Sequence, residues 1–439
     1  MSRKIVILGS GISGLGAAIL AKKKGFNVFL SDSKIIAEKS KKMLLDNDIA
    51  WEEGQHTFQK IFNADEVIKS PGICDTIDLI QKLKINNIPV ISEVEFAFRY
   101  TKAKIAAITG SNGKTTTTLL LGQILKEAGY DVLVAGNIGV GFAFSIAERD
   151  YDYIVLELSS FQLDGIKEFR SDVAVILNIT PDHLDRYDYK FENYVRSKFR
   201  ITKNQTKKDI LIYNTDDSVV NRIQTKAKKI PISLLNKQSE GGFIYQNELI
   251  IKLNNQTMTI QELALQGKHN IFNSMAASIA ARVFEVEDSV IRQSMIDFQS
   301  LEHRLEHVLT VHGIDFINDS KATNINSCWF ALESMQKDVV WIAGGADKGN
   351  NYADLHELVI DKVKAIVCLG NNSEKIIANF KGKVDVIVQA SSMNDAVNQS
   401  YSLANKGEVV LLSPACASFD LFLNYEDRGL QFKNAVRSL

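Results

Sequence analysis

The stretch ITGSNGKTT, residues 108–116, almost spells a phosphate-binding loop. The usual pattern, G-x-x-x-x-G-K-[ST], requires a glycine at the position that Ile108 occupies. The stretch lies between a predicted strand at 104–110 and a predicted helix at 116–128, which is where such a loop must lie. Because Ile108 falls inside the strand, we interpret the loop as a shortened form. A glycine turn that precedes a lysine by chance is the less favoured alternative.

The residues of this stretch suit a nucleoside triphosphate. Gly110 and Gly113 would allow backbone N–H groups to turn toward phosphates, and Lys114 would neutralise charge on the β- and γ-phosphates. The hydroxyl of Thr115 would reach Mg²⁺. By itself the stretch predicts a triphosphate site and no particular reaction.

A second glycine-rich turn lies near the N-terminus, where GSGISG (9–14) matches G-x-G-x-x-G between a predicted strand (4–9) and a predicted helix (15–24). Asp32 ends the next predicted strand. This pattern indicates a dinucleotide site, with the pyrophosphate at the helix N-terminus and the carboxylate on a ribose. Two alternatives stay open: a tight turn without a ligand, and a site for the diphosphate of another nucleotide. The ATP-type loop downstream disfavours NAD as the ligand of this turn.

Strands alternate with helices along the chain, which predicts βαβ units and mostly parallel sheets. We expect three α/β domains: a Rossmann-like N-terminal domain (1–93), a central P-loop ATPase-type domain (94–299) and a Rossmann-like C-terminal domain (300–439). Residues 241–260 alternate like antiparallel strands and would form an insertion in the central domain. The stretch EVEFAFRYTKAK (93–104) is expected to be a connection, and the third sheet is expected to be an open parallel sheet.

The composition fits a soluble globular protein, because 45% of the 439 residues are apolar and 23% are charged. The formal net charge of -1 gives no reason to expect nucleic acid or a membrane surface as a partner. No apolar run approaches the roughly 20 residues that span a bilayer, and the N-terminal run ends too early for a signal peptide. Neither a zinc site nor a disulfide framework is indicated by the scattered cysteines, Cys74, Cys328, Cys368 and Cys416. We therefore expect a cytoplasmic protein.

Polar side chains follow several predicted strands. Glu157 ends a strand in LELSSFQLD, and His183 follows another in NITPDHLDRYD. Since the carboxyl ends of parallel strands share one crevice, these two side chains could hold divalent cations beside phosphates. Taken singly, each could be a solvated loop residue. Lys198 lies on a predicted helix soon after His183, where an ordinary solvated lysine is the simplest interpretation from the residues alone.

The third domain shows the same arrangement. INDSKATN ends one strand and carries Asp319, Lys321 and Thr323, and GGADKG ends the next with Lys348. SPACASFDLFLNYEDRG follows the last strand. Polar and basic groups at one edge of the sheet suit a small anionic substrate.

Taken together, these motifs resemble those of the Mur ligases, the ATP-dependent amide-forming enzymes of peptidoglycan precursor synthesis. The resemblance covers essentially the whole chain, through TGSNGKTTT, GNIG, LELSSFQL, NITPDHLDRY, SKFRI, GKHNIFN, HRLE, NDSKATN and LLSPACASFD. The first motif is shared with folylpolyglutamate synthases, whereas SSFQL, DHLDRY and SPACASFD point to the members that add D-glutamate. The D-N-P-R motif of the members that add diaminopimelate or lysine is absent from the sequence.

The resemblance implies that the first domain binds UDP rather than NAD. The residues at this site would be Ile12, Ser13, Asp32, Ser33, Lys34 and Gly72, with Asn137, Gln162 and His183 at the muramoyl-alanine end. Lys34 stands where the family has arginine, so its contact with phosphate would lose the planar fork of a guanidinium.

The resemblance also implies ligands for ATP, metal and amino acid. ATP would contact Gly110, Ser111, Asn112, Gly113, Lys114, Thr115, Thr116, Asn270, Arg304, Asp319 and Lys321. Two Mg²⁺ ions would be held by Thr115, Glu157, His183 and Lys198, the last being carbamylated in this family into a carboxylate-like ligand. The catalytic residues would be Lys114, His183 and Lys198. Thr323, with Asp319 and Lys321, would face the ATP and substrate. D-Glutamate would be held by Lys348, Ser418, Phe419 and Tyr425, and the family often has Leu and Phe in place of the last two.

The implied reaction is the ATP-dependent addition of D-glutamate to UDP-N-acetylmuramoyl-L-alanine through an acyl phosphate, in cytoplasmic peptidoglycan precursor synthesis. The expected partners are these small-molecule substrates, and the expected state is a monomer. Two other classes of function stay open on the residues alone. One is an NAD-dependent oxidoreductase that uses the first glycine turn, and the other is a nucleotide switch that binds without catalysis.

Overall fold

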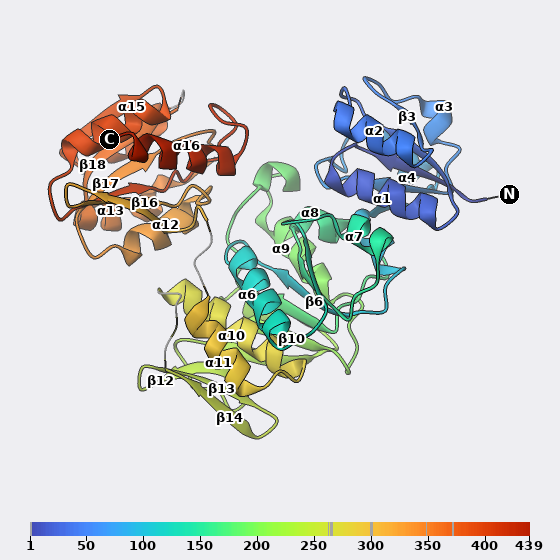
Figure 1. Cartoon of the computed structure of the whole chain (residues 1–439), viewed down its shortest axis with the longest axis horizontal. Helices are drawn as coiled ribbons and strands as arrows, with labels where there is room; N and C mark the ends of the chain where they lie inside the picture. The colour runs from blue at the N-terminus through green and yellow to red at the C-terminus, as the bar shows by residue number, and fades with distance from the viewer. Residues whose placement is uncertain (1, 262, 264–266, 299–301, 348, 371–372) are drawn as a thin grey trace. The chain divides into compact units, whose positions relative to one another are not determined.

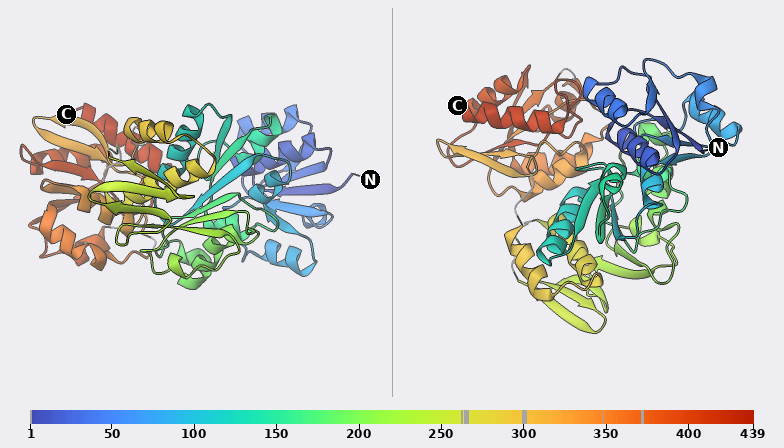
Figure 2. Two further views of the ribbon diagram at one scale, coloured as in Figure 1. Left: turned by 90° about the horizontal axis from the view of Figure 1, so that it is seen from below. Right: turned by 45° about the vertical axis from the view of Figure 1, so that its right-hand side comes forward.

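The computed structural model describes residues 2–261, 263, 267–298, 302–347, 349–370 and 373–439. These residues divide into two compact units, Met1–Phe298 and Gln299–Leu439, and each unit is described by itself. Figures 1 and 2 show the ribbon from three directions. The first unit holds two β-sheets and the second unit holds one, so the prediction of three α/β sheets is confirmed.

The first sheet is parallel and carries the N-terminal glycine turn at its centre. Its strands lie in the order β3-β2-β1-β4-β5 and comprise β1 Lys4–Leu8, β2 Asn27–Ser31, β3 Ala50–Glu52, β4 Glu66–Lys69 and β5 Val90–Ser92. Ile5 and Ile7 enter one hydrophobic cluster and Val6 and Leu8 another, because successive side chains of a strand point to opposite faces. The helices of this part are α1 Ile12–Lys23, α2 Glu38–Asp46, α3 Phe58–Ile61 and α4 Asp78–Ile85. The strand order reverses between β1 and β4, which makes the carboxyl end of β1 the point where such sheets bind ligands.

The second sheet combines a parallel part with an antiparallel extension. Its order is β14-β13-β12-β11-β10-β9-β6-β8-β7. The strands are β6 Lys104–Thr109, β7 Val132–Gly136, β8 Tyr153–Glu157, β9 Val173–Ile176, β10 Ile210–Asn214, β11 Lys228–Ser233, β12 Gly241–Tyr245, β13 Glu248–Leu253 and β14 Gln256–Ile260. The strands from β7 to β12 pair in parallel, whereas β12, β13 and β14 pair antiparallel, as the alternation in 241–260 predicted. The helices are α6 Lys114–Glu127, α7 Phe142–Glu148, α8 Ser160–Asp164, α9 Phe191–Phe199, α10 Lys268–Val283 and α11 Asp288–Asp297.

Both glycine turns lead directly into a helix. The α1 helix begins at Ile12 and α6 begins at Lys114, earlier than the predicted starts at 15 and 116. Gly11 and Gly113 occupy the positions just before these helices. The free backbone N–H groups of each first helical turn therefore lie immediately next to the glycines, as an anion site requires.

The stretch expected to be a plain connection between the first two sheets is partly helical, as α5 Glu93–Phe98. Glu95 is fully buried, and its Oε2 accepts hydrogen bonds from the backbone N–H groups of Lys167, Glu168 and Phe169 at 2.8, 2.9 and 2.9 Å. Arg99 donates both to Glu95 and to Glu66 of β4. Hydrogen bonds therefore hold the connection to β4 of the first sheet and to the segment between α8 and β9, a tertiary effect that local propensity does not reveal.

The second unit contains a six-stranded sheet in the order β15-β16-β20-β17-β18-β19. Its strands are β15 Glu306–Val311, β16 Ile314–Asn318, β17 Val339–Ala343, β18 Val363–Leu369, β19 Val386–Ala390 and β20 Val409–Leu412. Its helices are α12 Ile325–Ser334, α13 His356–Lys362, α14 Glu374–Phe380, α15 Met393–Leu403 and α16 Tyr425–Arg437.

The expectation of an open parallel sheet is wrong for one strand of this unit. The strands β16 to β20 pair in parallel, but β15 pairs antiparallel with β16. His312 and Gly313 join the two strands with φ angles of 48° and 83°. Two consecutive residues with positive φ form the tight turn that hairpins favour, and this produces an antiparallel edge strand.

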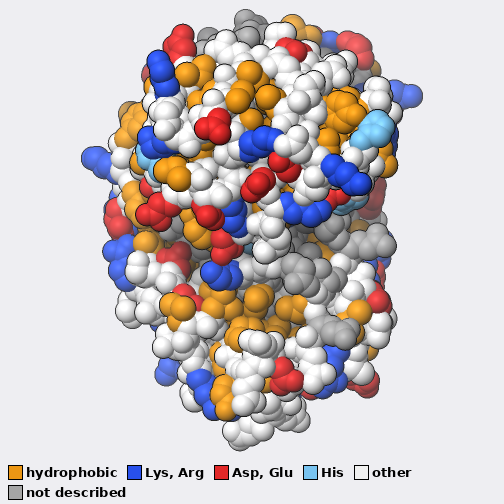
Figure 3. Space-filling model, turned by 90° about the vertical axis from the view of Figure 1, so that its left-hand side faces the viewer, with side chains coloured by type: hydrophobic (Ala, Val, Ile, Leu, Met, Phe, Trp, Pro, Cys, Tyr) orange, Lys and Arg blue, Asp and Glu red, His pale blue; other side chains and the backbone are white. Residues whose placement is uncertain are grey.

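The face of the molecule drawn in Figure 3 carries no strong bias of charge. On the face drawn in Figure 3, acidic and basic side chains are interspersed among apolar and uncharged ones. None of the helices in the described part of the chain is both long and apolar enough to cross a bilayer.

The domain boundaries at 93/94 and 299/300 stay predictions.

Candidate active site

The loop after β6 is shaped by Gly113, which has a φ of 83°. A Cβ at this position would lie 2.3 Å from Oδ1 of Asn273, so only glycine allows helix α10 to approach the loop this closely. Asn273 also accepts a hydrogen bond from Thr117 Oγ1 at 3.3 Å and donates to Oδ1 of the predicted ATP ligand Asn270 at 3.1 Å. Asn273 of α10 thus packs against the loop, whereas the sequence indicated only its hydrogen-bond partner Asn270.

Asn178 fixes the loop from the other side. Its Oδ1 accepts a hydrogen bond from the backbone N of Asn112 at 2.8 Å, and its Nδ2 donates to the carbonyl of Asn112 at 3.1 Å. Its own carbonyl accepts from the backbone N of Ser111 at 2.8 Å, and Ser111 Oγ donates to the carbonyl of Thr180 at 2.9 Å. Asn178 lies within the motif NITPDHLDRY, but nothing in its local sequence indicated that it orders the loop.

Replacing Asn178 by alanine is expected to raise the KM for ATP roughly ten-fold, because two hydrogen bonds that hold the loop backbone are lost. Steady-state kinetics with varied ATP would measure the effect. The matched control is Asn204→Ala, since Asn204 also donates twice to backbone carbonyls, those of Lys167 and Phe169. The control should lower the melting temperature and leave the KM for ATP unchanged. Equal changes of KM in both variants would contradict a specific role for Asn178.

Two lysines converge on one carbonyl of the loop. Lys114 Nζ donates to the carbonyls of Gly110 and Ser111, each at 2.8 Å, and Lys198 Nζ donates to the carbonyl of Gly110 at 2.7 Å. Lys198 is only 1% exposed, so the alternative of an ordinary solvated lysine is wrong. Burial, and next the charge of Lys114, hold the pKa of Lys198 well below its usual value. Lys198 therefore has a larger share of neutral, nucleophilic amine than a surface lysine.

Glu157 presents an unused carboxylate oxygen at the end of β8. The residue is 2% exposed, which excludes a solvated loop acid. Its Oε1 accepts a hydrogen bond from Asn137 Nδ2 at 2.7 Å, whereas Oε2 has no partner among the described residues. Thr116 Oγ1 is likewise buried without a described partner, and Thr115 is 7% exposed. Buried polar atoms without partners mark places where a ligand can complete the coordination.

His183 lies on the loop that follows β9. Its backbone is left-handed, with a φ of 52°, and its ring meets that of Phe161 edge-on at 5.2 Å. Its Nε2 lies 3.6 Å from Asp182 Oδ2. Nearby, Gln162 Oε1 accepts hydrogen bonds from the backbone N and Oγ of Ser159, both at 2.9 Å, in a capping box at the start of α8. The predicted contact of Gln162 with substrate stays a prediction.

The N-terminal turn is closely packed around its glycines. A Cβ on Gly14 would lie 1.9 Å from the carbonyl oxygen of Gly9, so only glycine fits at this position in the first turn of α1. Asp32 accepts hydrogen bonds from the backbone N and Oγ of Ser10, both at 2.7 Å, and from the backbone N of Lys34 at 2.9 Å. Burial opposes ionisation of Asp32, but these hydrogen bonds outweigh it and lower the pKa. A charged Asp32 therefore orders the turn.

The remaining predicted residues of this turn lie at or near the surface. Ile12 is 67% exposed, which is unusual for an apolar side chain at the start of a helix. Ser13 is half-buried, and Ser33, Lys34 and Gly72 are exposed. The carbonyl of Gly72 accepts a hydrogen bond from Arg186 Nη1 at 3.1 Å. Arg186 belongs to the DHLDRY motif and links the N-terminal turn region to the loop of His183.

In the second unit, Asp319 is enclosed at the end of β16. Burial raises the pKa of Asp319 to about 7, against the charge of Arg304 and a 2.9 Å hydrogen bond from Ser413 Oγ. Lys321 Nζ lies 5.1 Å from the centre of the Tyr425 ring, which brings two predicted ligands together. Thr323 is half-buried, Ser418 is buried and Phe419 is 73% exposed. Lys348 lies outside the described residues.

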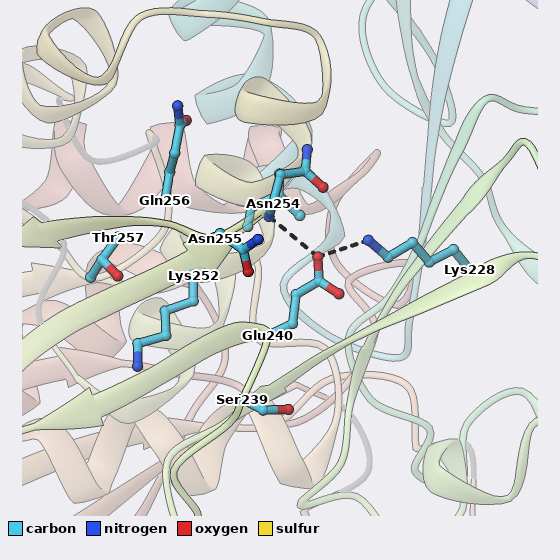
Figure 4. Close-up of a pocket in the computed structure, with 9 residues that line it drawn as sticks. Lys228, Ser239, Glu240, Lys252, Asn254, Asn255, Gln256 and Thr257 are labelled. Atoms are coloured by element: carbon cyan, nitrogen blue, oxygen red, sulfur yellow. Dashed lines mark hydrogen bonds and ion pairs between the residues drawn. The ribbon is translucent and has the colours of Figure 1, made fainter.

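A separate cavity of about 580 Å³ lies beside the hairpins β12–β14. Figure 4 shows that Glu240 accepts from Lys228 Nζ and from the backbone N of Asn254 within it, at 2.7 and 3.4 Å. None of the predicted site residues lines this cavity. In the ranges that the structure describes, no three His, Cys, Asp or Glu side chains are grouped to hold a metal ion.

Three family models match this chain. The Mur ligase middle domain matches residues 108–281, the Mur ligase, glutamate ligase domain matches residues 303–416, and the MurD N-terminal domain matches residues 4–78. Among solved structures, a pseudomurein peptide ligase type C from Methanothermus fervidus has a TM-score of 0.64 at 19% identity and covers 100% of both chains. A UDP-N-acetylmuramate-alanine ligase from Thermotoga maritima has a TM-score of 0.63 at 16% identity and covers 99% of both chains. These two likenesses show the fold.

Curated relatives share far more of the sequence. A protein of Christiangramia forsetii named UDP-N-acetylmuramoylalanine--D-glutamate ligase is 53% identical, with 100% of both chains covered. A protein of the same name from Bacteroides fragilis is 52% identical over the same share. Because the identity is this high over the full length, the chain belongs to the Mur ligase family, in the group of the UDP-N-acetylmuramoylalanine--D-glutamate ligases.

Proposed function

We propose that this protein joins D-glutamate to UDP-N-acetylmuramoyl-L-alanine with the conversion of ATP to ADP and phosphate, as a step of peptidoglycan synthesis in the cytoplasm. The full-length identity to D-glutamate ligases supports the reaction. The observation in the structure that carries the proposal is the pair of lysines, Lys114 and Lys198, at one carbonyl of the phosphate loop. The same loop is ordered by Asn178.

A carboxylate does not react with an amine by itself, because its oxygen is a poor leaving group. In the proposed reaction the L-alanyl carboxylate attacks the γ-phosphorus of ATP, forming an acyl phosphate and releasing ADP. The amine of D-glutamate then attacks the acyl carbon, loses a proton, and phosphate departs. Catalysis is mostly positioning and charge neutralisation, which suits the loop N–H groups and Lys114.

The residues present fit a Mg²⁺ site. Glu157 Oε2 and Thr116 Oγ1 are buried without described partners, and Thr115 directly precedes Thr116 in the sequence. We propose that Thr115, Glu157, His183 and a carbamylated Lys198 hold two ions. Bound Mg²⁺ would supply positive charge to phosphate oxygens. The lowered pKa of Lys198 supports its modification, since the neutral amine adds to CO₂ and releases a proton to give a carbamate anion.

The remaining substrates are assigned to the three predicted domains. We propose that domain 1–93 binds the UDP moiety through the N-terminal turn, that domain 94–299 binds ATP, and that domain 300–439 binds D-glutamate. Asn137, Gln162 and His183 would contact the muramoyl-alanine end, and Asn270, Arg304, Asp319 and Lys321 would lie near ATP. A monomer that acts on small molecules is sufficient for this reaction.

The test supplies UDP-N-acetylmuramoyl-L-alanine, ATP and Mg²⁺ together with a panel of amino acids, and measures the release of phosphate. We expect release that depends on D-glutamate and is much weaker with L-glutamate, L-lysine or diaminopimelate. Release without preference for D-glutamate would reject the proposed specificity. Binding of NADH without binding of UDP-sugars would instead support the oxidoreductase alternative, and binding of ATP without phosphate release would support a nucleotide switch.

A further inference from the structure

Asp420 in the second unit has two carboxylate oxygens without a partner. Both oxygens are shielded from solvent, and no described residue forms a hydrogen bond with either of them. Asp420 belongs to the SPACASFD motif, but it is not among the residues predicted to bind D-glutamate or to take part in the reaction. Because an enclosed carboxylate without donors is costly, its presence points to a ligand that completes it.

The carboxylate of Asp420 lies at the end of the sheet where ligands commonly bind. A Cβ on Gly370, directly after β18, would lie 2.5 Å from Asp420 Oδ2 and 3.3 Å from the backbone N of Gly345, which follows β17. The carboxylate therefore lies against the carboxyl ends of two neighbouring parallel strands, and a glycine at 370 is what makes room for it. Ligands of open α/β sheets bind at this end of the strands.

The buried cation of this region does not complete Asp420. Arg428 is 1% exposed and feels the charge of Asp420, but its guanidinium donates elsewhere. It forms hydrogen bonds with Ser320 Oγ at 3.0 Å, with the carbonyl of Ser320 at 2.7 Å and with the carbonyl of Cys416 at 3.1 Å. Arg428 is thus committed to holding the start of α16 against the end of β16, which leaves Asp420 to another positive group.

We propose that Asp420 binds the ammonium group of the incoming amino acid and thereby positions its nitrogen, which loses one proton to solvent before the free amine attacks the activated carboxyl group. The inference rests on the proposed function. An ammonium ion offers three N–H donors and a positive charge, which match two unpaired carboxylate oxygens. Lys321, Ser418 and Tyr425 of the same unit then serve the carboxylates of D-glutamate.

The test compares D-glutamate with glutarate, which lacks only the ammonium group. In Asp420→Asn, the KM for D-glutamate should rise roughly 10- to 100-fold, because a charge-assisted hydrogen bond is lost. The inhibition constant of glutarate, measured against D-glutamate, should stay within about two-fold of the wild-type value, because glutarate never made that bond. The KM values for ATP and the UDP substrate should not change. Asp420→Ser, which also lacks the charge, should behave in the same way.

Stability and a control variant provide two independent readouts. Since Asp420→Asn removes a carboxylate whose oxygens are shielded from solvent and have no described partner, its melting temperature should equal or exceed that of the wild type. Glu374→Gln removes an exposed acidic charge from the first turn of α14 and should leave the KM for D-glutamate unchanged.

Two results would overturn the inference. The first is a similar rise of the KM for D-glutamate and of the inhibition constant of glutarate in Asp420→Asn, which would show that Asp420 acts through a group that binds carboxylates. The second is an unchanged KM for D-glutamate in Asp420→Asn, when phosphate release by the wild type does depend on D-glutamate. A wild type without any dependence on D-glutamate would instead reject the proposed function, so the two failures are distinguishable.

Discussion

Replacing Lys114 by alanine is expected to lower the ATP-dependent release of phosphate about a thousand-fold. Lys114 Nζ lies 2.8 Å from the carbonyls of both Gly110 and Ser111, so its charge stands at the loop that would hold the β- and γ-phosphates. In phosphoryl transfer the protein acts mainly through such fixed charges. Rates of phosphate release with saturating substrates would measure the loss.

The matched control for this variant is Lys126→Ala. Lys126 is an exposed lysine in the last turn of the same helix, α6, so its replacement removes the same charge from the opposite end. We expect the control to retain near wild-type activity and Lys114→Ala to keep a wild-type melting temperature within a few degrees. Wild-type turnover in Lys114→Ala would reject the assignment of residues 110–116 as the phosphate loop.

Local sequence patterns predicted the positions of both glycine turns and most of the strands. The reason is that a buried parallel strand and the glycines after it leave a local signature of apolar residues and a turn. Ile108 illustrates this point, because it lies inside β6 as the shortened loop requires. The start of α6 at Lys114 differs from the prediction by two residues, since helix ends depend on capping contacts.

The contacts that order the site could not be predicted from the sequence. Asn178 reaches the loop from the segment after β9 and Asn273 from α10, so their roles depend on how distant segments pack. Lys198 shows the same limit, because the residues alone favoured a solvated helix position and the structure places it 1% exposed. Only the resemblance to a known family predicted a functional role for Lys198. Its burial supplies the physical reason why it differs from a solvated lysine.

Lys198→Ala is expected to reduce phosphate release by at least about a hundred-fold, because the carbamate that would share in holding Mg²⁺ cannot form. A short carboxylic acid such as acetate or formate should restore part of the activity of this variant, since a free carboxylate can occupy the space of the deleted side chain. The wild type should not respond to the acid. Lys203→Ala, which removes an exposed lysine from the following segment, is the matched control and should keep full activity.

A spectroscopic readout separates the modification of Lys198 from a purely structural role. With ¹³C-labelled bicarbonate, the wild type should show a carbamate carbon signal by NMR, and Lys198→Ala should not. Lys114→Ala should weaken this signal, because the charge of Lys114 both lowers the pKa of Lys198 and stabilises the carbamate anion beside it. A wild type without the signal that nevertheless turns over at full rate would remove the carbamate from the mechanism. Lys198 would then act as a buried amine bonded to the carbonyl of Gly110, and its contribution would be to shape the loop.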